Sequence, residues 1–304
     1  MTLTEMRYLV ALARERHFGR TAEVCHVSQP TLSVAIKKVE KQLGATLFER
    51  TASGVRVTAL GERIVGQARR VLEEAVKLEE IAGAAGDPMS GQLRVGIIYT
   101  IAPYLLPQLI PAMSRVAPAM PLFLREDFTA NLIPALKSGE LDAIIIALPL
   151  SEPGLVAQPV YDEPFRVVVP AGHPWAGRPE IPADELDGQD LLLPGVGNCF
   201  RDQVLESCPR LAGLEAQGHV QEGSSLETIR YMVVSGVGVA VMPSTAADPL
   251  AGREPLVRVL PFAGRSPSRT VGLVWRVTYP RSQAIDVLRA AVLSCALPGT
   301  TARR

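Results

Sequence analysis

The 304-residue sequence predicts an α/β body, preceded by a small helical head and one long connecting helix. Three observations support this fold class. Beyond residue 91, short apolar segments alternate with segments of helical pattern. The first 44 residues contain three short segments with the pattern of a helix, and no strong helix breaker interrupts residues 58–85. The chain is therefore long enough for two domains or so, each with its own buried core.

Composition and charge narrow the class of protein. With 47% hydrophobic and 20% charged residues, the chain reads as a globular protein, and no apolar run reaches the ~18 residues of a membrane span. The N-terminus lacks the pattern of a secretory signal, so we expect a cytoplasmic protein, whose thiols are kept reduced. Residues 1–66 carry ten basic and six acidic side chains, a net charge of +4, which suggests a polyanion partner at that end.

The head has the pattern of a helix-turn-helix. Helices are expected over Thr4–Arg16 and Gly19–Cys25, and a third opens at a capping Ser28, with Pro30 in its first turn, and ends at Gly44. A helix that enters the ~12 Å major groove of DNA needs short polar side chains at its leading end and basic groups for phosphates.

The expected DNA contacts come from the third helix and from a wing around residues 52–54. Lys38 is a further phosphate candidate, and the alternative to DNA binding is an ordinary three-helix bundle with solvated lysines. The candidate DNA-binding residues are Ser28, Gln29, Pro30, Thr31, Ser33, Lys37 and Arg50.

The head also carries a resemblance to a known family. The runs Phe18–Glu23, Val27–Ser33, Glu40–Gly44 and Leu47–Arg50 resemble the N-terminal domain of LysR-type transcriptional regulators. That resemblance implies a body of two periplasmic-binding-protein-like subdomains joined by two crossover strands. It also implies promoter DNA as a partner, a homodimer that pairs into a tetramer, and contact with RNA polymerase.

The connecting helix carries an apolar seam from Leu60 to Ala82, which fits pairing with a partner helix, although packing on its own chain is the alternative. The domains we expect are 1–58 (winged helix-turn-helix), 59–90 (dimerisation helix and hinge) and 91–304 (regulatory domain, with subdomain I at 91–162 and 269–304 and subdomain II at 163–268).

The body should contain parallel α/β sheets with ligands at the C-terminal ends of their strands. We expect the two crossings near Leu155–Glu163 and Ser266–Thr270. The expected strands are Leu93–Ile97, Leu122–Glu126, Ala143–Ala147, Val167–Val169, Leu191–Leu193, Val237–Met242 and Val271–Trp275. The expected helices are Ala102–Val116, Thr129–Ser138, Arg201–Ser207, Ser225–Ser235 and Arg281–Leu297.

Two of the four cysteines, Cys199 and Cys208, lie nine residues apart. Cys199 should stand where a turn gives way to a helix starting near Phe200, and the amides of that helix start, with Arg201, would favour a thiolate. The alternative is a pair of buried, inert thiols. Packing roles are expected for Cys25 and Cys295, and the absence of metal-ligand spacings and catalytic motifs predicts no metal, no cofactor and no enzyme.

Within the LysR family, the chain is most similar to the peroxide-sensing activators of oxidative-stress genes. The similarity lies in Tyr99–Pro107, Cys199–Gln203 with Cys208, Ser224–Arg230 and Arg269–Val274. It implies that peroxide oxidises Cys199 to a sulfenic acid, that Cys208 resolves it as an intramolecular disulfide, and that a thioredoxin- or glutaredoxin-type reductant resets the pair.

The same similarity implies a peroxide pocket of Thr100, Thr129, Asn198 and Arg269. Asn198 stands where some members carry histidine, and Pro209 stiffens the chain beside Cys208.

A disulfide needs Cα atoms within ~7 Å, whereas nine helical residues span roughly 13 Å, so the segment between the cysteines must rearrange. Three other functions stay open. One is a regulator that binds a small metabolite in the inter-subdomain cleft and whose cysteines are passive, and another is a thiol peroxidase. The third is a solute-binding protein, which the lack of a secretory signal disfavours.

Overall fold

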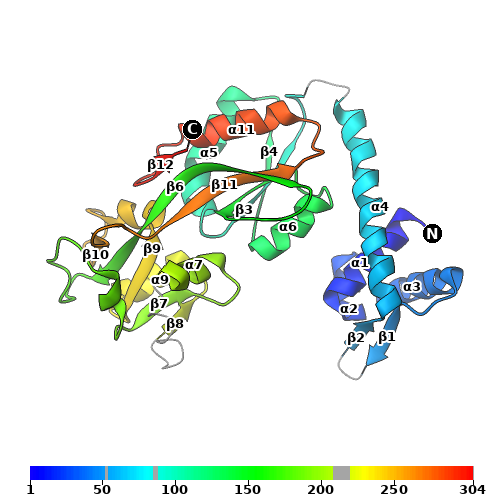
Figure 1. Cartoon of the computed structure of the whole chain (residues 1–304), viewed down its shortest axis with the longest axis horizontal. Coiled ribbons are helices and arrows are strands. Elements are labelled where there is room, and N and C mark those ends of the chain that lie inside the picture. Colours follow the sequence, from blue (N-terminus) through cyan, green and yellow to red (C-terminus); the bar gives the residue numbers. More distant parts are fainter. Residues whose placement is uncertain (52–53, 85–87, 208–219, 304) are drawn as a thin grey trace. The chain divides into compact units, whose positions relative to one another are not determined.

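The computed structural model describes residues 1–51, 54–84, 88–207 and 220–303. The chain divides into two compact units, Met1–Ala85 and Gly86–Arg304. Figure 1 shows the first unit as a small helical head with one long helix, and the second as an α/β body. The fold class predicted from the sequence is thus confirmed.

Three helices and a two-stranded hairpin make up the head. Helix α1 begins with a capping box, in which Thr2 Oγ1 accepts from Glu5 N (3.2 Å) and Thr2 N donates to Glu5 Oε2 (2.7 Å). Leu9, Leu12 and Ile36 lie in the apolar core of the head. The elements are α1 (Leu3–Glu15), α2 (Phe18–Val24), α3 (Gln29–Leu43), β1 (Phe48–Thr51) and β2 (Gly54–Val57).

The connecting helix α4 (Ala59–Ala84) begins where Thr58 Oγ1 accepts from Gly61 N (2.9 Å). Its first half packs on α1, with Val65 and Ala68 buried, so this part of the seam contacts its own chain. Leu78, further along the helix, is 71% exposed. Val71 and Ala75 of the same seam are half-buried, so among the described side chains of this half the leucine is the exposed one.

The body consists of two subdomains that share crossing strands. In the first, β3, β4 and β5 are parallel; in the second, β7, β8 and β9 are parallel. The first subdomain holds β3 (Leu93–Ile98), α5 (Ala102–Val116), β4 (Leu122–Asp127), α6 (Thr129–Lys137), β5 (Ala143–Leu148) and α11 (Ser282–Ser294). The second holds β7 (Leu191–Pro194), α7 (Cys199–Ser207), β8 (Val220–Gly223), α9 (Leu226–Val234), β9 (Val239–Pro243) and α10 (Ser244–Ala247). Shorter elements are η1 (Ala183–Leu186), η2 (Asp248–Leu250), β10 (Val257–Pro261) and β12 (Thr301–Ala302).

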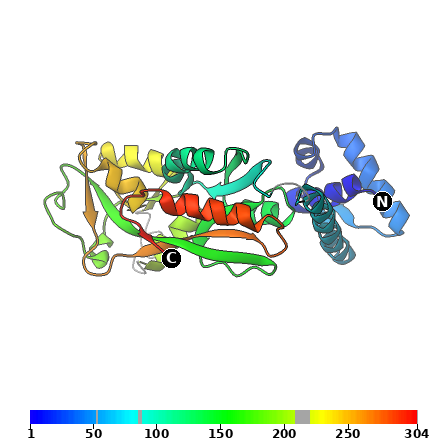
Figure 2. The same ribbon diagram turned by 90° about the horizontal axis from the view of Figure 1, so that it is seen from above.

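The long strand β6 (Leu155–Pro170) joins the two subdomains, accompanied by β11 (Ser268–Arg276), as Figures 1 and 2 show. The sequence predicted a crossing at Leu155–Glu163 and a separate strand at Val167–Val169, and this division was wrong. Pro159 pairs with Gly272 at a register shift between β6 and β11. A proline has no N–H to donate, and an irregularity of this kind tolerates it, so the strand continues. Strand β6 pairs with β11 up to Pro164 and with β9 from Phe165 onward.

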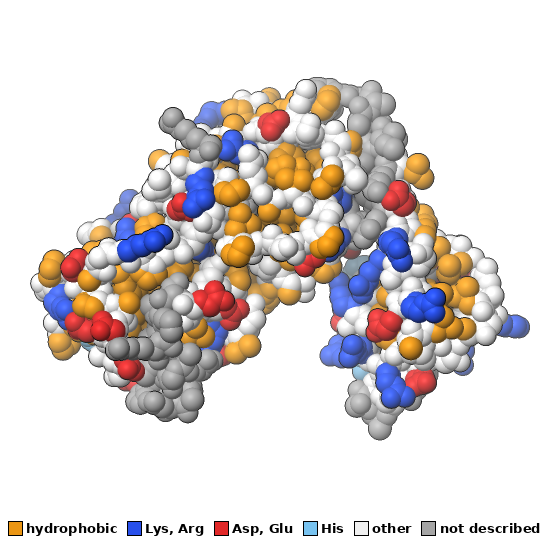
Figure 3. Space-filling view, in the orientation of Figure 1, with side chains coloured by type: hydrophobic (Ala, Val, Ile, Leu, Met, Phe, Trp, Pro, Cys, Tyr) orange, Lys and Arg blue, Asp and Glu red, His pale blue; other side chains and the backbone are white. Residues whose placement is uncertain are grey.

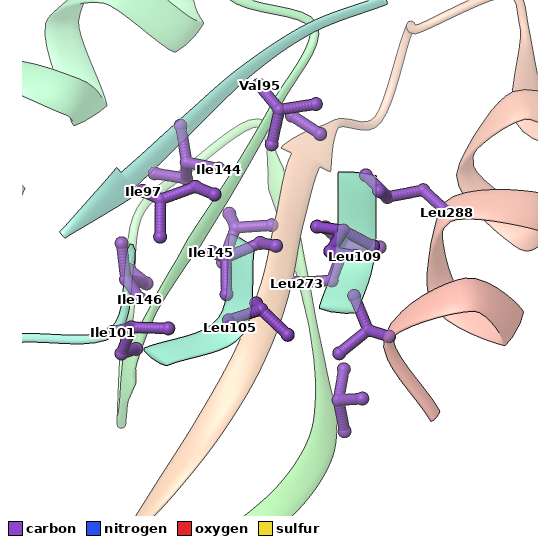
Figure 4. Packing of buried hydrophobic residues seen from close by; sticks show 14 of the residues in the cluster. Val95, Ile97, Ile101, Leu105, Leu109, Ile144, Ile145, Ile146, Leu273 and Leu288 are labelled. Atoms are coloured by element: carbon purple, nitrogen blue, oxygen red, sulfur yellow. The ribbon is translucent and has the colours of Figure 1, made fainter. Parts of the chain in front are cut away.

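Each subdomain has its own apolar core. Figure 4 shows the first, where Leu105 and Leu109 of α5 and Leu288 of α11 meet Ile145 and Leu273 of the sheet. The second core includes Phe165 and Phe200, whose rings meet edge to face at 5.1 Å. The two cores meet where β6 and β11 cross. The side chains of these two strands at the crossing therefore lie at the boundary between the subdomains.

Candidate functional site

Helix α7 begins at Cys199 because Asn198 caps it. Asn198 Oδ1 accepts from Phe200 N (3.0 Å), and the Asn198 carbonyl accepts from Arg201 N (2.9 Å). Gly197 before it has a φ of +90°, a conformation that other residues rarely adopt. The helix thus starts one residue before Phe200 and two before the expected range Arg201–Ser207, and the cysteine is in its first turn.

Cys199 lies at the boundary between the two cores. Its half-buried side chain packs against the core of the first subdomain, although α7 belongs to the second, whereas Phe200 is fully buried in the second core. In Figure 1, α7 lies on the side of the second subdomain that faces the first. Thr129, at the start of α6, donates its hydroxyl proton to Cys199 Sγ at 3.8 Å. The thiol therefore contacts both subdomains.

Arg269 and Thr100, two predicted site residues, contact each other. Arg269 Nη1 donates to Thr100 Oγ1 (2.8 Å) and Nη2 donates to the Thr100 carbonyl (3.0 Å). The guanidinium carbon lies 5.3 Å from the centre of the Phe200 ring. Since Thr100 Oγ1 accepts from Arg269, its own hydroxyl proton remains available for another acceptor.

Glu163 completes this cluster, and no pattern in the sequence predicted it as a site residue. Arg269 Nε donates to Glu163 Oε2 at 2.7 Å, and both side chains are 0% exposed. Glu163 Oε1 accepts from Thr245 N (3.1 Å) and from the Thr245 hydroxyl. Glu163 and Arg269 are direct partners in the β6–β11 register, but 106 residues separate them in the chain, so no local pattern could indicate the pair.

A second missed residue is Gln203, one helical turn after Cys199. Its Oε1 atom is buried and has no hydrogen-bond partner among the described residues. Positions i and i+4 lie on the same face of a helix, so Gln203 and Cys199 share a face of α7. The i+4 spacing was the signal that could have identified this residue.

The sequence suggested that Arg201 stabilises a thiolate at Cys199, but the contacts of its side chain are with β7 and β8. Its Nη1 atom donates to the Pro194 carbonyl (2.8 Å) and forms an ion pair with Glu222 Oε1 (3.3 Å), contacts that tie α7 to β7 and β8. Cys208 and Pro209 lie outside the described residues. The structure therefore brings together Thr129 with Cys199 and Thr100 with Arg269, with Asn198 as the cap beside them.

Of the two other described cysteines, Cys295 packs against the core of the first subdomain, and Cys25 is half-buried in the head. Cys25 follows α2, and Cys295 follows α11, where its Sγ donates to the Ala291 carbonyl (3.3 Å). Burial raises the pKa of each of these thiols. A raised pKa means less thiolate at a given pH, so these two cysteines are poor nucleophiles.

In the head, α3 presents most of the predicted DNA-binding residues. Ser28 caps the helix, its Oγ accepting from Thr31 N (3.3 Å) and lying 2.7 Å from Thr31 Oγ1. Ser28, Gln29, Pro30, Thr31 and Lys37 are exposed, and Ser33 is half-buried. Figure 3 shows several Lys and Arg side chains on the visible face of the head.

Two further basic residues of the head were candidates for phosphate contacts, Lys38 and Arg50. Lys38 Nζ binds Glu5 Oε1 at 2.7 Å and so links α3 to α1. The pKa of the Glu5 carboxyl is lowered, chiefly by that bond. Arg50 lies in β1, but its side chain falls outside the described residues.

Two other kinds of site are absent from the part of the chain that the structure describes. No three His, Cys, Asp or Glu side chains there are grouped so that they could hold a metal ion. Within the same residues, no helix has the length and apolar character needed to cross a bilayer.

Comparisons with known proteins agree with this architecture. Residues 3–62 match the family model described as "Bacterial regulatory helix-turn-helix protein, lysR family", and residues 86–295 match the "LysR substrate binding domain". A relative from Escherichia coli strain K12, "DNA-binding transcriptional dual regulator OxyR", is 41% identical over 292 residues, which are 96% of this chain and 95% of that protein.

Solved structures give the same picture. A full-length OxyR cysteine-to-aspartate variant from Pseudomonas aeruginosa matches with a TM-score of 0.72 and 50% identity, covering 100% of this chain and 99% of that one. A hydrogen-peroxide-bound OxyR cysteine-to-serine mutant from Corynebacterium glutamicum matches with a TM-score of 0.64 and 34% identity, covering 96% and 91% of the two chains.

The raised pKa values of Cys25 and Cys295 predict slow alkylation. At about pH 8, iodoacetamide should modify both thiols more slowly in the folded protein than in urea, because fewer are ionised. The difference should shrink as the pH rises through the folded-state pKa values. Peptide mass mapping of timed samples measures both rates, and equal rates in the two states at about pH 8 would contradict this assignment.

Proposed function

We propose that this chain, which belongs to the LysR family of bacterial helix-turn-helix regulators, activates transcription in response to hydrogen peroxide through a reversible Cys199–Cys208 disulfide. The observation that carries the proposal is the position of Cys199, half-buried between the subdomains with the Thr129 hydroxyl at its sulfur. The names of its relatives, which include "Hydrogen peroxide-inducible genes activator", support the choice of signal.

The first chemical step oxidises Cys199. Its thiolate attacks one peroxide oxygen, an S–O bond forms, the O–O bond breaks, and the leaving hydroxide takes up a proton to become water. Thr129, Thr100 and Arg269 supply hydroxyl and guanidinium donors that can orient the two oxygens. The unpartnered Gln203 Oε1 can accept a hydrogen bond from peroxide, and the Asn198 amide nitrogen can donate one.

The second step forms the disulfide. Cys208 attacks the sulfenic sulfur, an S–S bond forms, and water leaves. Cys199 and Ser207 are the two ends of α7, so their Cα atoms are roughly 12 Å apart at ~1.5 Å per residue. One further residue recovers at most ~3.8 Å, which leaves at least ~8 Å where a disulfide allows ~7 Å. Helix α7 must therefore unwind in part.

We infer that this unwinding is the switch. Refolding of α7 and the chain after it changes the surface of the second subdomain, and with it the subunit contacts that set the spacing of two DNA-binding heads. In this account residues 1–58 bind DNA, 59–90 dimerise and 91–304 regulate. A dithiol reductant of the thioredoxin or glutaredoxin type returns two electrons to the disulfide, and RNA polymerase is the target of activation.

The head of this regulator should read DNA through α3. Gln29, Pro30 and Thr31 are exposed in the first turn of α3, where a recognition helix meets base edges, and Ser28 caps that turn. Ser33 lies further along, and Lys37 and Arg50 are assigned to phosphates.

Replacing Lys37 tests the DNA-binding assignment. We expect Lys37→Ala to weaken binding to promoter DNA and to reduce the slope of log K against log[salt] by about 0.9, because one phosphate contact is lost. Fluorescence anisotropy over a range of salt concentrations measures both. Arg115→Ala removes one exposed charge from the body and is the control. A Lys37→Ala slope equal to wild type would remove Lys37 from the phosphate contacts.

Replacing Cys199 tests the sensing proposal. Cys199→Ser should keep promoter binding but show no peroxide-induced change in transcription, because an alcohol cannot form a sulfenic acid. Cys295→Ser is the matched control, since it removes a thiol from a packing position, and it should respond as wild type does. In vitro transcription with and without peroxide gives the readout. A normal peroxide response from Cys199→Ser would exclude this mechanism, whereas a wild-type protein that does not respond to peroxide would favour a metabolite in the cleft.

A further inference from the structure

The orientation of the Arg269 guanidinium depends on Glu163, which contacts neither Cys199 nor Thr100 in the described contacts. A guanidinium is planar, with five N–H donors in a fixed fork, so binding at Nε sets the direction of both Nη groups. Glu163 Oε2 accepts from Nε at 2.7 Å, and Nη1 and Nη2 then donate to Thr100 (2.8 and 3.0 Å). Glu163 thus determines where the guanidinium points.

Thr245 holds Glu163 in turn. The Thr245 amide (3.1 Å) and hydroxyl both donate to Glu163 Oε1, the oxygen that Arg269 does not use. All three side chains are buried, so water does not compete for these bonds. Both carboxylate oxygens are therefore fixed, one by each neighbour.

The four residues Thr245, Glu163, Arg269 and Thr100 form a continuous row of contacts between the subdomains. Thr245 lies in α10, directly after β9 of the second subdomain, and Thr100 follows β3 of the first. Glu163 lies in β6 two residues before that strand changes its partner from β11 to β9. A movement of one subdomain relative to the other would strain these bonds and shift Arg269.

We propose that Glu163 and Thr245 are positioning residues, which aim Arg269 at peroxide bound beside Cys199 and make its aim depend on the arrangement of the two subdomains. This inference rests on the proposed function, because it concerns how fast Cys199 reacts with peroxide. Neither residue touches the reacting atoms, and their effect passes through Arg269.

The same two strands supply a matched control on their other face. Successive residues of a strand point to opposite sides, so Asp162 and Thr270 face away from Glu163 and Arg269. Thr270 Oγ1 donates to Asp162 Oδ1 at 2.6 Å, a hydroxyl–carboxylate bond like that of Thr245 with Glu163. Thr270→Val therefore removes the same kind of bond from the same crossing without reaching Arg269.

The test compares two reagents at Cys199 in the full chain. Hydrogen peroxide needs the oriented donors, whereas iodoacetamide needs only an accessible thiolate. We expect Thr245→Val to slow peroxide oxidation of Cys199 roughly tenfold, the size of one lost hydrogen bond to a charged group, and to leave alkylation within about twofold of wild type. Thr245→Ser, which keeps both donors, and Thr270→Val should both react at the wild-type rate.

Glu163→Gln provides a second variant, which keeps the side-chain volume but removes the charge that fixes Nε, and it should also slow the peroxide reaction selectively. Wild-type peroxide rates in folded Thr245→Val and Glu163→Gln would overturn the inference. Equal slowing of both reagents would also overturn it, because that result indicates only a structural role. If Cys199 of the wild-type protein reacts with peroxide no faster than Cys295, the proposed function itself fails.

Discussion

The buried ion pair between Glu163 and Arg269 is the interaction on which the body depends. Removing two charges from water is costly unless hydrogen bonds satisfy them, and here Thr245 and Thr100 do so from opposite subdomains. Breaking such a pair by removing one partner typically costs ~3–5 kcal/mol, because a buried charge is left uncompensated. The pair therefore fixes the register of β6 against β11 and the place where the subdomains meet.

Under the proposed function, this arrangement gives the thiol at the start of α7 its role as a sensor. Asn198 caps the helix, Phe200 anchors it in the second core under the Arg269 guanidinium, and Cys199 reaches the first core. The helix has only nine residues, so its stability comes from these contacts more than from its length. Chemistry that moves Cys199 out of its place therefore acts on the whole segment and on the boundary between the subdomains.

The parts of the structure that sequence could predict are those with local signals. The cap at Ser28, Pro30 in the first turn and the C-terminal Gly44 specify α3, and helical periodicity gives α4 and α5. Resemblance, rather than periodicity, led to Thr100, Thr129 and Arg269. Glu163 and the continuity of β6 escaped prediction because both depend on pairing with β11, about a hundred residues away, and such pairing leaves no local period.

The measurement that tests this account most directly is peptide mass mapping of the full chain before and after brief treatment with hydrogen peroxide under anaerobic handling. The account predicts one new linked peptide that joins Cys199 to Cys208, the loss of two titratable thiols, and return of both thiols after a dithiol reductant. Unchanged thiols, or a disulfide that involves Cys25 or Cys295 in place of this pair, would contradict it.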